Sequence, residues 1–265
     1  MGAHHINEGF NDWGRFFVHV VRAMWTGVNP YTDLGPAGSD PFVNPPWLWL
    51  PLAPLFWVLW WLAMAILPLV LLWLAYRDKN IWLILIVGTS WSFISLSAYA
   101  GPDWVAWVGV ALGGPVGLLL NSAKPQIGIF SIFAELGDLW RARDWQNTVK
   151  LFMPVAIIGG AMTLLYPMWI GNMFSTTDIA GDRNLAPFPW LLPLGGYFIW
   201  RAWRTGEKMW GVAATACIAP YFLIYSPAPL IYFVARKNWK WGLALNAASW
   251  AVFILAFNGI IDRGI

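Results

Sequence analysis

The chain has one cysteine, Cys217, and three histidines among its 265 residues. A single thiol cannot form an internal disulfide or a cysteine-ligated metal cluster, which excludes a disulfide framework. His4, His5 and His19 are too few and too close to the N-terminus for haem or di-metal ligation inside a helical bundle. We therefore expect no cofactor held by these ligands, and His4 and His5 stay open only as an adventitious surface pair.

Charge is also scarce, because Asp, Glu, Lys and Arg together make up 11% of the chain. The net charge of +3 is spread over many loops, and without a basic tract nothing supports nucleic-acid binding. Hydrophobic residues make up 59% of the sequence, with 22 tryptophans, and the rest are too few to build a water-facing surface. Tryptophan prefers the membrane interface. The composition therefore predicts an integral membrane protein surrounded by lipids.

The first 46 residues contain no apolar run of signal-peptide length. They open with a helical pattern instead, in which Asn11 or Asp12 is a possible cap. The large apolar residues that follow at helical spacing are Trp13, Phe16, Phe17, Val20 and Met24. This pattern predicts an amphipathic helix at the membrane surface. We expect its apolar face to pack onto protein, because interfacial burial alone docks such a helix without anchoring it.

Long apolar runs predict an all-α, polytopic transmembrane bundle over residues 47–265, after an N-terminal helix and Pro/Gly loop over residues 1–46. Five runs approach the roughly 20 residues that a spanning helix needs, at 53–76, 80–98, 104–121, 150–170 and 241–261. Three shorter or interrupted runs lie at 125–137, 187–200 and 209–235. The last contains "YSPAP", and broken segments at membrane depth are typical of re-entrant or cavity-lining parts. The total is about seven or eight membrane segments.

Basic residues give this bundle an orientation, since short cytoplasmic loops are rich in Lys and Arg. Twelve of the sixteen Lys and Arg residues fall on one side of the predicted bundle, the cytoplasmic side: Arg77, Lys79, Lys124, Arg141, Arg143, Lys150, Arg201, Arg204, Lys208, Arg236, Lys237 and Lys240. Residues 1–46 fall on the other side and are expected to be extracytoplasmic. Asp103 is also expected on the extracytoplasmic side, where it should cap the next helix. Basic residues at both ends of 125–137 predict that this run is re-entrant or lies in the membrane plane.

The polar loop after the surface helix carries short motifs in an unusual order. Asp12 is followed by "GVNPY" (27–31) and "NPPWLWLPLAPL" (44–55), and later by "KPQ" (124–126). Together they resemble the GT-C fold glycosyltransferases that use polyprenyl-phosphate sugars, most closely the bacterial α-mannosyltransferases. Two departures are Asn44, where that family has tyrosine, and the family's first span, for which the eleven residues before Asp12 leave no room. The resemblance implies a bacterial inner membrane.

The resemblance further implies that a sugar leaves a polyprenyl phosphate and joins a hydroxyl acceptor on the extracytoplasmic side. Such a transfer needs a carboxylate base for the acceptor hydroxyl. Asp12 is implied as this base, and its expected place at a helix N-terminus favours the ionised carboxylate. Because Asp is also a preferred N-cap, a capping role alone stays open.

The departing lipid phosphate needs cationic or amide donors. The implied donors are Arg15 and Arg22 on the surface helix and Lys124 of "KPQ", with Gln126 beside it. Arginine forks match phosphate oxygens, and a lysine where a span breaks can direct its charge into a cavity. The alternatives are snorkelling for the two arginines and a positive-inside anchor for Lys124.

Four residues of the polar loop complete the implied substrate site: Asn29, Tyr31, Asp33 and Asp40. Asn29 and Tyr31 are expected to fix the turn that returns the chain to the bilayer, with Tyr31 as an interfacial anchor. Asp33 and Asp40 are candidate ligands for the acceptor or a divalent cation. Ordinary turn chemistry is the alternative for both. We expect no other metal or cofactor.

Three functions stay open at this point. The first is a hexosyltransferase that takes its sugar from a polyprenyl-phosphate donor. The second is a non-catalytic subunit that keeps a shortened GT-C-like scaffold and packs against other membrane chains. The third is a small-solute transporter, which the broken helices favour, although the sequence has no intramembrane acid pair or convincing repeat. The sugar and the acceptor are not specified by the sequence.

Overall fold

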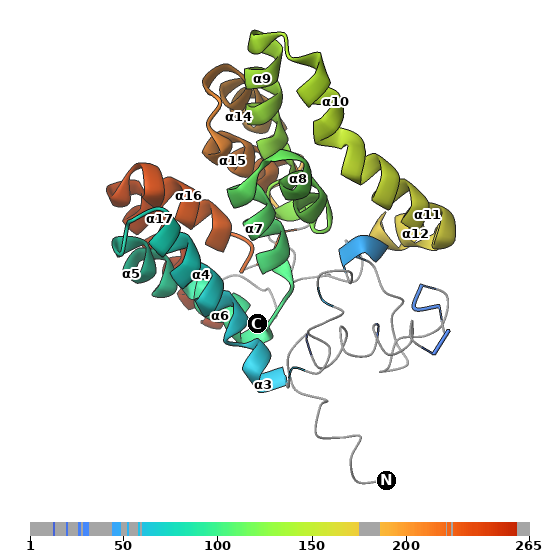
Figure 1. The fold of residues 1–265 in the computed structure, drawn as a ribbon. Coiled ribbons are helices and arrows are strands. Elements are labelled where there is room, and N and C mark those ends of the chain that lie inside the picture. Colours follow the sequence, from blue (N-terminus) through green and yellow to red (C-terminus); the bar gives the residue numbers. More distant parts are fainter. Residues whose placement is uncertain are drawn as a thin grey trace.

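The computed structural model describes residues 13, 20, 26, 27, 29–31, 44–48, 52, 58, 60–174, 186–220, 222, 223 and 225–258. This part of the chain is mainly helical and contains no strand, which confirms the all-α prediction. Figure 1 shows the helices in chain order. Their bounds are η3 (Pro46–Leu48), α3 (Trp60–Ala63), α4 (Ile66–Arg77), α5 (Trp82–Gly88), α6 (Trp91–Tyr99), α7 (Asp103–Leu112), α8 (Gly114–Ser122), η5 (Pro125–Ile127), η6 (Ile129–Ser131), α9 (Ile132–Ala142), α10 (Trp145–Pro154), the π-turn η7 (Val155–Gly159), α11 (Gly160–Leu165), α12 (Met168–Phe174), α14 (Leu192–Thr205), α15 (Lys208–Ile218), α16 (Ala228–Lys237) and α17 (Trp239–Phe257).

Helices α7 and α8 lie at the centre of the molecule, between two groups of helices (Figure 1). On one side α4, α5, α6, α16 and α17 pack together, and α4 contacts α7. On the other side α9, α14 and α15 pack against one another, while α10 runs past α8. The central pair and a direct contact between α15 and α16 therefore join the two groups.

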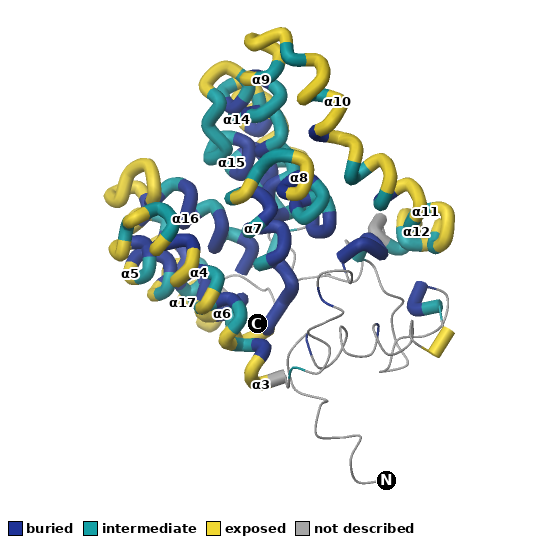
Figure 2. Tube along the Cα trace, viewed as in Figure 1, coloured by how far each residue is buried: buried dark blue, intermediate teal, exposed yellow. Residues whose placement is uncertain are grey.

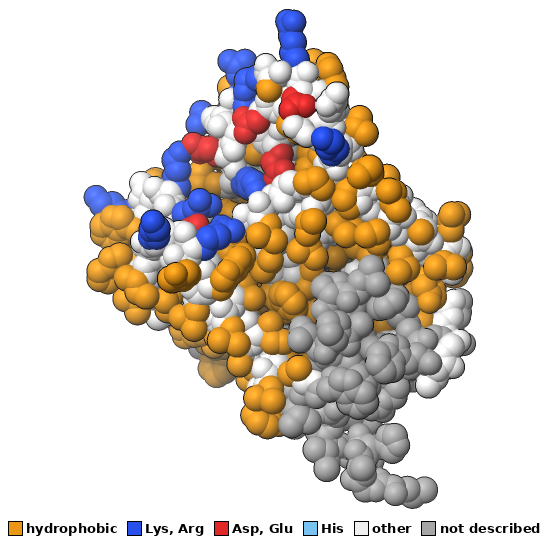
Figure 3. All heavy atoms as spheres, viewed as in Figure 1, with side chains coloured by type: hydrophobic (Ala, Val, Ile, Leu, Met, Phe, Trp, Pro, Cys, Tyr) orange, Lys and Arg blue, Asp and Glu red, His pale blue; other side chains and the backbone are white. Residues whose placement is uncertain are grey.

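The buried side chains form two apolar clusters. One fills the space between α7 and the α4–α5–α16 group, around Trp107 and Tyr232. The other lies at the far end of α7, where Trp13, Tyr31 and Trp47 pack around Val105. Figure 2 shows burial concentrated on α7 and the inner helix faces, with exposed residues along α10. The outer faces expose large apolar side chains, as Figure 3 shows, which is the pattern of a surface that faces lipid.

The run 104–121 is not one spanning helix, so that prediction was wrong. It folds as an antiparallel hairpin of α7 and α8, with its tip at Gly113 and Gly114. The two legs touch backbone to backbone, because a Cβ placed on Gly109 would lie 2.6 Å from the carbonyl oxygen of Gly117. Hydropathy along the run is continuous, but the two adjacent glycines take positive φ angles that turn the chain back.

Polar side chains clamp the tip of this hairpin. The Gly114 N–H donates to Glu135 Oε2 at 2.7 Å, and Lys208 Nζ lies 3.0 Å from Glu135 Oε1. Gly113 has φ 70° and ψ −169°, a region that other residues rarely enter. A Cβ there would overlap the Lys208 ammonium and lie 2.6 Å from Glu135 Oε1. The tip therefore requires glycine for its conformation, and a Cβ at Gly113 would also displace the two side chains of the clamp.

Gly113→Ala should lower the free energy of unfolding by about 3 kcal/mol, through backbone strain and loss of the clamp. Gly114→Ala is the matched control, because Gly114 also has positive φ, 64°, but has no neighbouring atom within 4 Å of a built Cβ. We expect about 1 kcal/mol for the control. Thermal or denaturant unfolding in detergent measures both values, and equal losses for the two variants would contradict the clamp.

The run 80–98 is also divided, into α5 and α6, which meet at a bend of 76°. Ser90 caps α6 by accepting a hydrogen bond from the Phe93 N–H at 3.2 Å. Side chains of α17 hold the bend open: Asn246 Nδ2 donates to the Ile86 carbonyl at 2.8 Å, and Trp250 Nε1 donates to the Thr89 carbonyl at 2.8 Å. The backbone carbonyls that lack helical partners at the bend thus accept hydrogen bonds from side chains of another helix.

One helix in the described part of the chain, Trp145–Leu165, is both long and apolar enough to cross a membrane: it has 21 residues, and the mean hydropathy of its 18-residue window is 1.7. Counting the bent α5–α6 pair as one span makes two. The helix continues through Pro154 by means of the π-turn η7 and ends before Tyr166, so the run predicted at 150–170 begins and ends earlier. Seven or eight continuous spans are not seen among the described helices.

The remaining runs are found with changed bounds. The run 53–76 contains α3 and α4, and 241–261 corresponds to α17. The expected break at "YSPAP" is confirmed, since α15 ends at Ile218 and α16 begins at Ala228. The run 125–137 does not turn back: η5 and η6 lead directly into α9, which continues to Ala142. Its predicted re-entrant form was therefore wrong.

Candidate functional site

The N-terminal region packs against the base of the α7–α8 hairpin, next to the start of the "KPQ" motif. Trp47 Nε1, in η3, donates to Ser122 Oγ at the end of α8 over 3.2 Å. Ala123, the next residue, belongs to the same buried cluster as Tyr31 and Trp47. Trp47 is 7% exposed and Ala123 is 1% exposed, so this contact is an interior one. Segments about 75 residues apart in the chain are thereby placed side by side.

A buried ion pair closes this end of the hairpin. Lys124 Nζ lies 2.6 Å from Asp103 Oδ2, and the two side chains are 9% and 1% exposed. Asp103 is the first residue of α7, and Lys124 directly precedes η5. Removing two charges from water is costly unless each has a partner, so a pair at this depth is a candidate for a functional role.

Two predictions about this pair were wrong. Asp103 was expected to cap the helix, but Pro102 occupies the N-cap and Asp103 bonds Lys124 instead. Asp103 and Lys124 were also placed on opposite sides of the membrane. The hairpin brings both residues to one end, away from the Glu135 and Lys208 clamp at the tip.

Asn29 and Tyr31 form the predicted turn. The Tyr31 N–H donates to Asn29 Oδ1 at 3.0 Å, and the Tyr31 hydroxyl donates to the Asn44 carbonyl at 2.8 Å. Asn172 Nδ2, from α12, donates to the Tyr31 carbonyl at 3.1 Å. Tyr31 is only 2% exposed, so the prediction of an interfacial anchor was wrong: the side chain fastens the polar loop to the interior.

Burial keeps the Tyr31 phenol neutral. Loss of water around the ring raises its pKa above the ordinary value, and the neighbouring Tyr166 raises this pKa further. The two rings lie 5.6 Å apart between centroids. Tyr31 therefore serves as a hydrogen-bond donor to Asn44 and has no acid–base role near neutral pH.

The described part of the N-terminal region supports the packing predicted for the surface helix. Trp13 is 1% exposed and Val20 is 5% exposed, and Trp13 Nε1 donates to the Val58 carbonyl at 3.0 Å. Both side chains pack on the protein itself, as predicted. Gln126 is half-buried in η5, beside Lys124.

Five predicted site residues lie outside the described residues: Asp12, Arg15, Arg22, Asp33 and Asp40. Phe16, Phe17 and Met24 of the surface helix lie outside them as well. The base, the two arginine donors and the divalent-cation ligands therefore stay predictions. Of the predicted site, the structure brings together Tyr31, Asn29, Lys124 and Gln126 around one end of the hairpin, and it adds Asp103.

No family model, no curated protein and no solved structure matches the chain. The functional argument therefore rests on the residues of this chain and their arrangement. That arrangement has two parts: the packed loop segment around Trp47, and the buried carboxylate–ammonium pair two residues beyond Ser122.

Proposed function

We propose that the protein is a membrane-embedded glycosyltransferase of the GT-C type, which moves a sugar from a polyprenyl-phosphate donor to a hydroxyl acceptor on the extracytoplasmic side. One observation carries the proposal. The loop segment 44–48, which carries one of the motifs, lies against the end of α8, because Trp47 donates to Ser122, two residues before Lys124 of the "KPQ" motif. Motifs that contribute to one reaction must lie near one another, and this placement supports the proposal.

The chain lies in the bilayer as a polytopic bundle in this proposal, with short, bent and hairpin segments beside the long helix 145–165. Support comes from the exposed apolar side chains on the outer helix faces, such as Leu69 and Leu164, and from Trp190 in the turn before α14. A water-soluble protein rarely exposes apolar surface this continuously. Membrane lipids and the lipid-linked donor are then the partners, in a bacterial inner membrane.

Within this reaction Asp12 deprotonates the acceptor, while Arg15 and Arg22 hold the phosphate of the donor. Lys124 has three N–H donors and, among the described residues, directs one to the Asp103 side chain; the other two are the proposed donors to a phosphate oxygen. Asp103 acts as a positioning residue, because it fixes the ammonium at the end of α8. The arrangement stabilises negative charge as the lipid phosphate departs.

A second function, a non-catalytic subunit, is favoured by one specific observation. Only 11% of the apolar segment of the helix Trp145–Leu165 is buried within the chain. A partner chain packed along α10 and α11 would cover this face, as would lipid. The subunit hypothesis predicts that the protein copurifies with another membrane chain and has no transfer activity of its own.

A reconstituted transfer assay tests the proposal. The purified protein in proteoliposomes, supplied with radiolabelled polyprenyl-phosphate hexoses and a bacterial membrane extract as acceptor, should transfer label in proportion to protein and time. Empty liposomes and heat-treated protein are the controls. If every hexose donor fails while the protein copurifies with a second membrane chain, the subunit hypothesis replaces the enzyme.

A further inference from the structure

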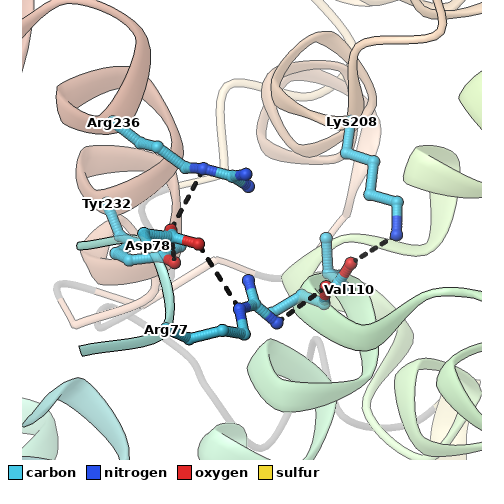
Figure 4. Close-up of polar contacts among 7 residues, drawn as sticks. Arg77, Asp78, Val110, Lys208, Tyr232 and Arg236 are labelled. Atoms are coloured by element: carbon cyan, nitrogen blue, oxygen red, sulfur yellow. Dashed lines mark hydrogen bonds and ion pairs between the residues drawn. The ribbon is translucent and has the colours of Figure 1, made fainter. Parts of the chain in front are cut away.

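We propose a second site, for the phosphate headgroup of an anionic phospholipid, at the tip end of the hairpin. Three cations form it: Arg77 at the end of α4, Arg236 in the last turn of α16, and Lys208 at the start of α15. Figure 4 shows their charged ends around the space between α16 and the hairpin. The inference requires the membrane location proposed above, but not sugar transfer.

Asp78 organises two of these cations. Its side chain is only 6% exposed, and Arg236 Nε and Arg77 Nε lie 3.0 Å and 3.4 Å from its carboxylate oxygens. The Tyr232 hydroxyl also donates to this carboxylate. Each arginine uses its Nε atom here, and among the described residues the two Nη groups of Arg236 meet no acceptor. A buried carboxylate thus orients guanidinium N–H groups that remain available to a ligand.

Two of the cations are held by adjacent carbonyls of the hairpin. Arg77 Nη1 donates to the Ala111 carbonyl at 3.0 Å, and Lys208 Nζ donates to the Val110 carbonyl at 2.9 Å. Glu135 neutralises part of the Lys208 charge. Three cations therefore share two carboxylates, Asp78 and Glu135, and the cluster keeps a net positive charge. A phosphate group supplies the missing negative charge and suits the planar arginine fork.

The surroundings of the cluster favour a lipid over free phosphate. The Arg77 guanidinium lies 5.3 Å from the ring centre of Trp73, on α4. Exposed tryptophans also stand at the neighbouring helix starts, and these are Trp82 on α5 and Trp239 and Trp241 on α17. In Figure 3 charged side chains gather at this end of the molecule, beside apolar surface. Tryptophans and arginines at one level are typical of the headgroup region.

A simple positive-inside anchor would differ in structure from this cluster. An anchor points its charge into water from a flexible stem. Here the Arg77 side chain is 28% exposed and bonds Asp78 and Ala111, so its position is set by two helices. Because the guanidinium is fixed in place, it can select a phosphate group at one defined position. A flexible anchor would only be attracted to negatively charged surfaces.

Lipid titration of the purified, delipidated chain in zwitterionic micelles tests the site, with bound phosphatidylglycerol counted by native mass spectrometry. Wild type should bind phosphatidylglycerol and not phosphatidylcholine. Arg236→Gln should weaken this binding about tenfold, the equivalent of one charge-assisted hydrogen bond. Arg204→Gln is the matched control, because Arg204 is an exposed cation at the end of α14. It should bind like wild type.

Several outcomes would overturn the site. Equal losses for Arg236→Gln and Arg204→Gln would mean general charge attraction, and displacement of the lipid by millimolar inorganic phosphate would mean a free-ion site. Arg236→Lys keeps the positive charge but loses the planar guanidinium, so its affinity for phosphatidylglycerol should lie between those of wild type and Arg236→Gln. Wild-type affinity in Arg236→Lys would overturn the geometric argument. Unchanged melting in phosphatidylcholine shows that each variant is folded. Lipid binding without sugar transfer would remove the proposed enzyme and keep this site.

Discussion

Replacing either partner of the Asp103–Lys124 pair alone should lower the free energy of unfolding by about 3–5 kcal/mol, because each change leaves an uncompensated buried charge. The side chains of Asp103 and Lys124 are 1% and 9% exposed, so water solvates the remaining partner poorly. The double variant Asp103→Asn with Lys124→Met carries no buried charge. The double variant should regain most of the lost free energy of unfolding. Denaturant unfolding in detergent measures this free energy for the two single variants and the double variant.

An exposed ion pair in the same chain provides the control. Arg141 and Asp138 on α9 form a pair in which the side chains are 44% and 62% exposed. Asp138→Asn should change the free energy of unfolding by no more than about 1 kcal/mol. If the single variants at Asp103 and Lys124 cost as little as this control, then water reaches the pair and the argument from burial fails.

The double variant also separates stability from chemistry. Once its fold is shown to be intact, any loss of sugar transfer reports on the Lys124 ammonium itself and not on an unfolded hairpin. Transfer at the wild-type rate would leave the pair with a structural role alone.

Asp12→Asn should lower the rate of sugar transfer by about 10²–10⁴-fold, the usual contribution of a general base. Asn caps a helix nearly as well as Asp, so the free energy of unfolding should stay unchanged. The contrast with the ion pair is the point of the experiment: one substitution costs stability, whereas the other costs rate. Initial rates at saturating donor in proteoliposomes, beside thermal unfolding, measure both effects.

Asp33→Asn and Asp40→Asn are the controls for this prediction, since both residues belong to the same polar loop. If Asp12→Asn turns over like wild type while one of these variants loses activity, then Asp12 is a cap and the base lies further along the loop. Sensitivity of Asp33→Asn or Asp40→Asn to added divalent cation would point to the ligand role instead.

Hydropathy and helical spacing predicted the helical fold, the break at "YSPAP" and the burial of Trp13 and Val20. These features follow from local sequence patterns, because apolar residues at helical spacing form one face of a helix that packs away from water. The hairpin was missed because its two legs are as apolar as one continuous helix. The signal that could have found it was the Gly113–Gly114 pair at the middle of the run, with Asp103 and Lys124 about equally far on each side.

The candidate site was predicted in part. Lys124 was expected there from its motif, but Asp103 was missed, because its assigned side depended on the wrong span. Tyr31 was expected at the interface because of the general preference of tyrosine. Its burial depends on the Asn44 carbonyl and Asn172, which come from distant parts of the chain. Pairings of this kind are set by packing, and a local pattern does not contain them.

The hairpin has a consequence for the number of times the chain passes from one face of the molecule to the other. Residues 103–122 leave and return at the same end, so they contribute no net passage, whereas one was expected. Residues 125–142 contribute one where none was expected, because α9 continues past Glu135 at the hairpin tip to Arg141, which bonds the Trp203 carbonyl at the end of α14. The passage that is lost at 103–122 is replaced by the passage that is gained at 125–142, so the total number of passages is unchanged. The predicted sidedness therefore changes only between the two segments, around Lys124, and the prediction that the basic loops on either side share one face of the membrane is unaltered.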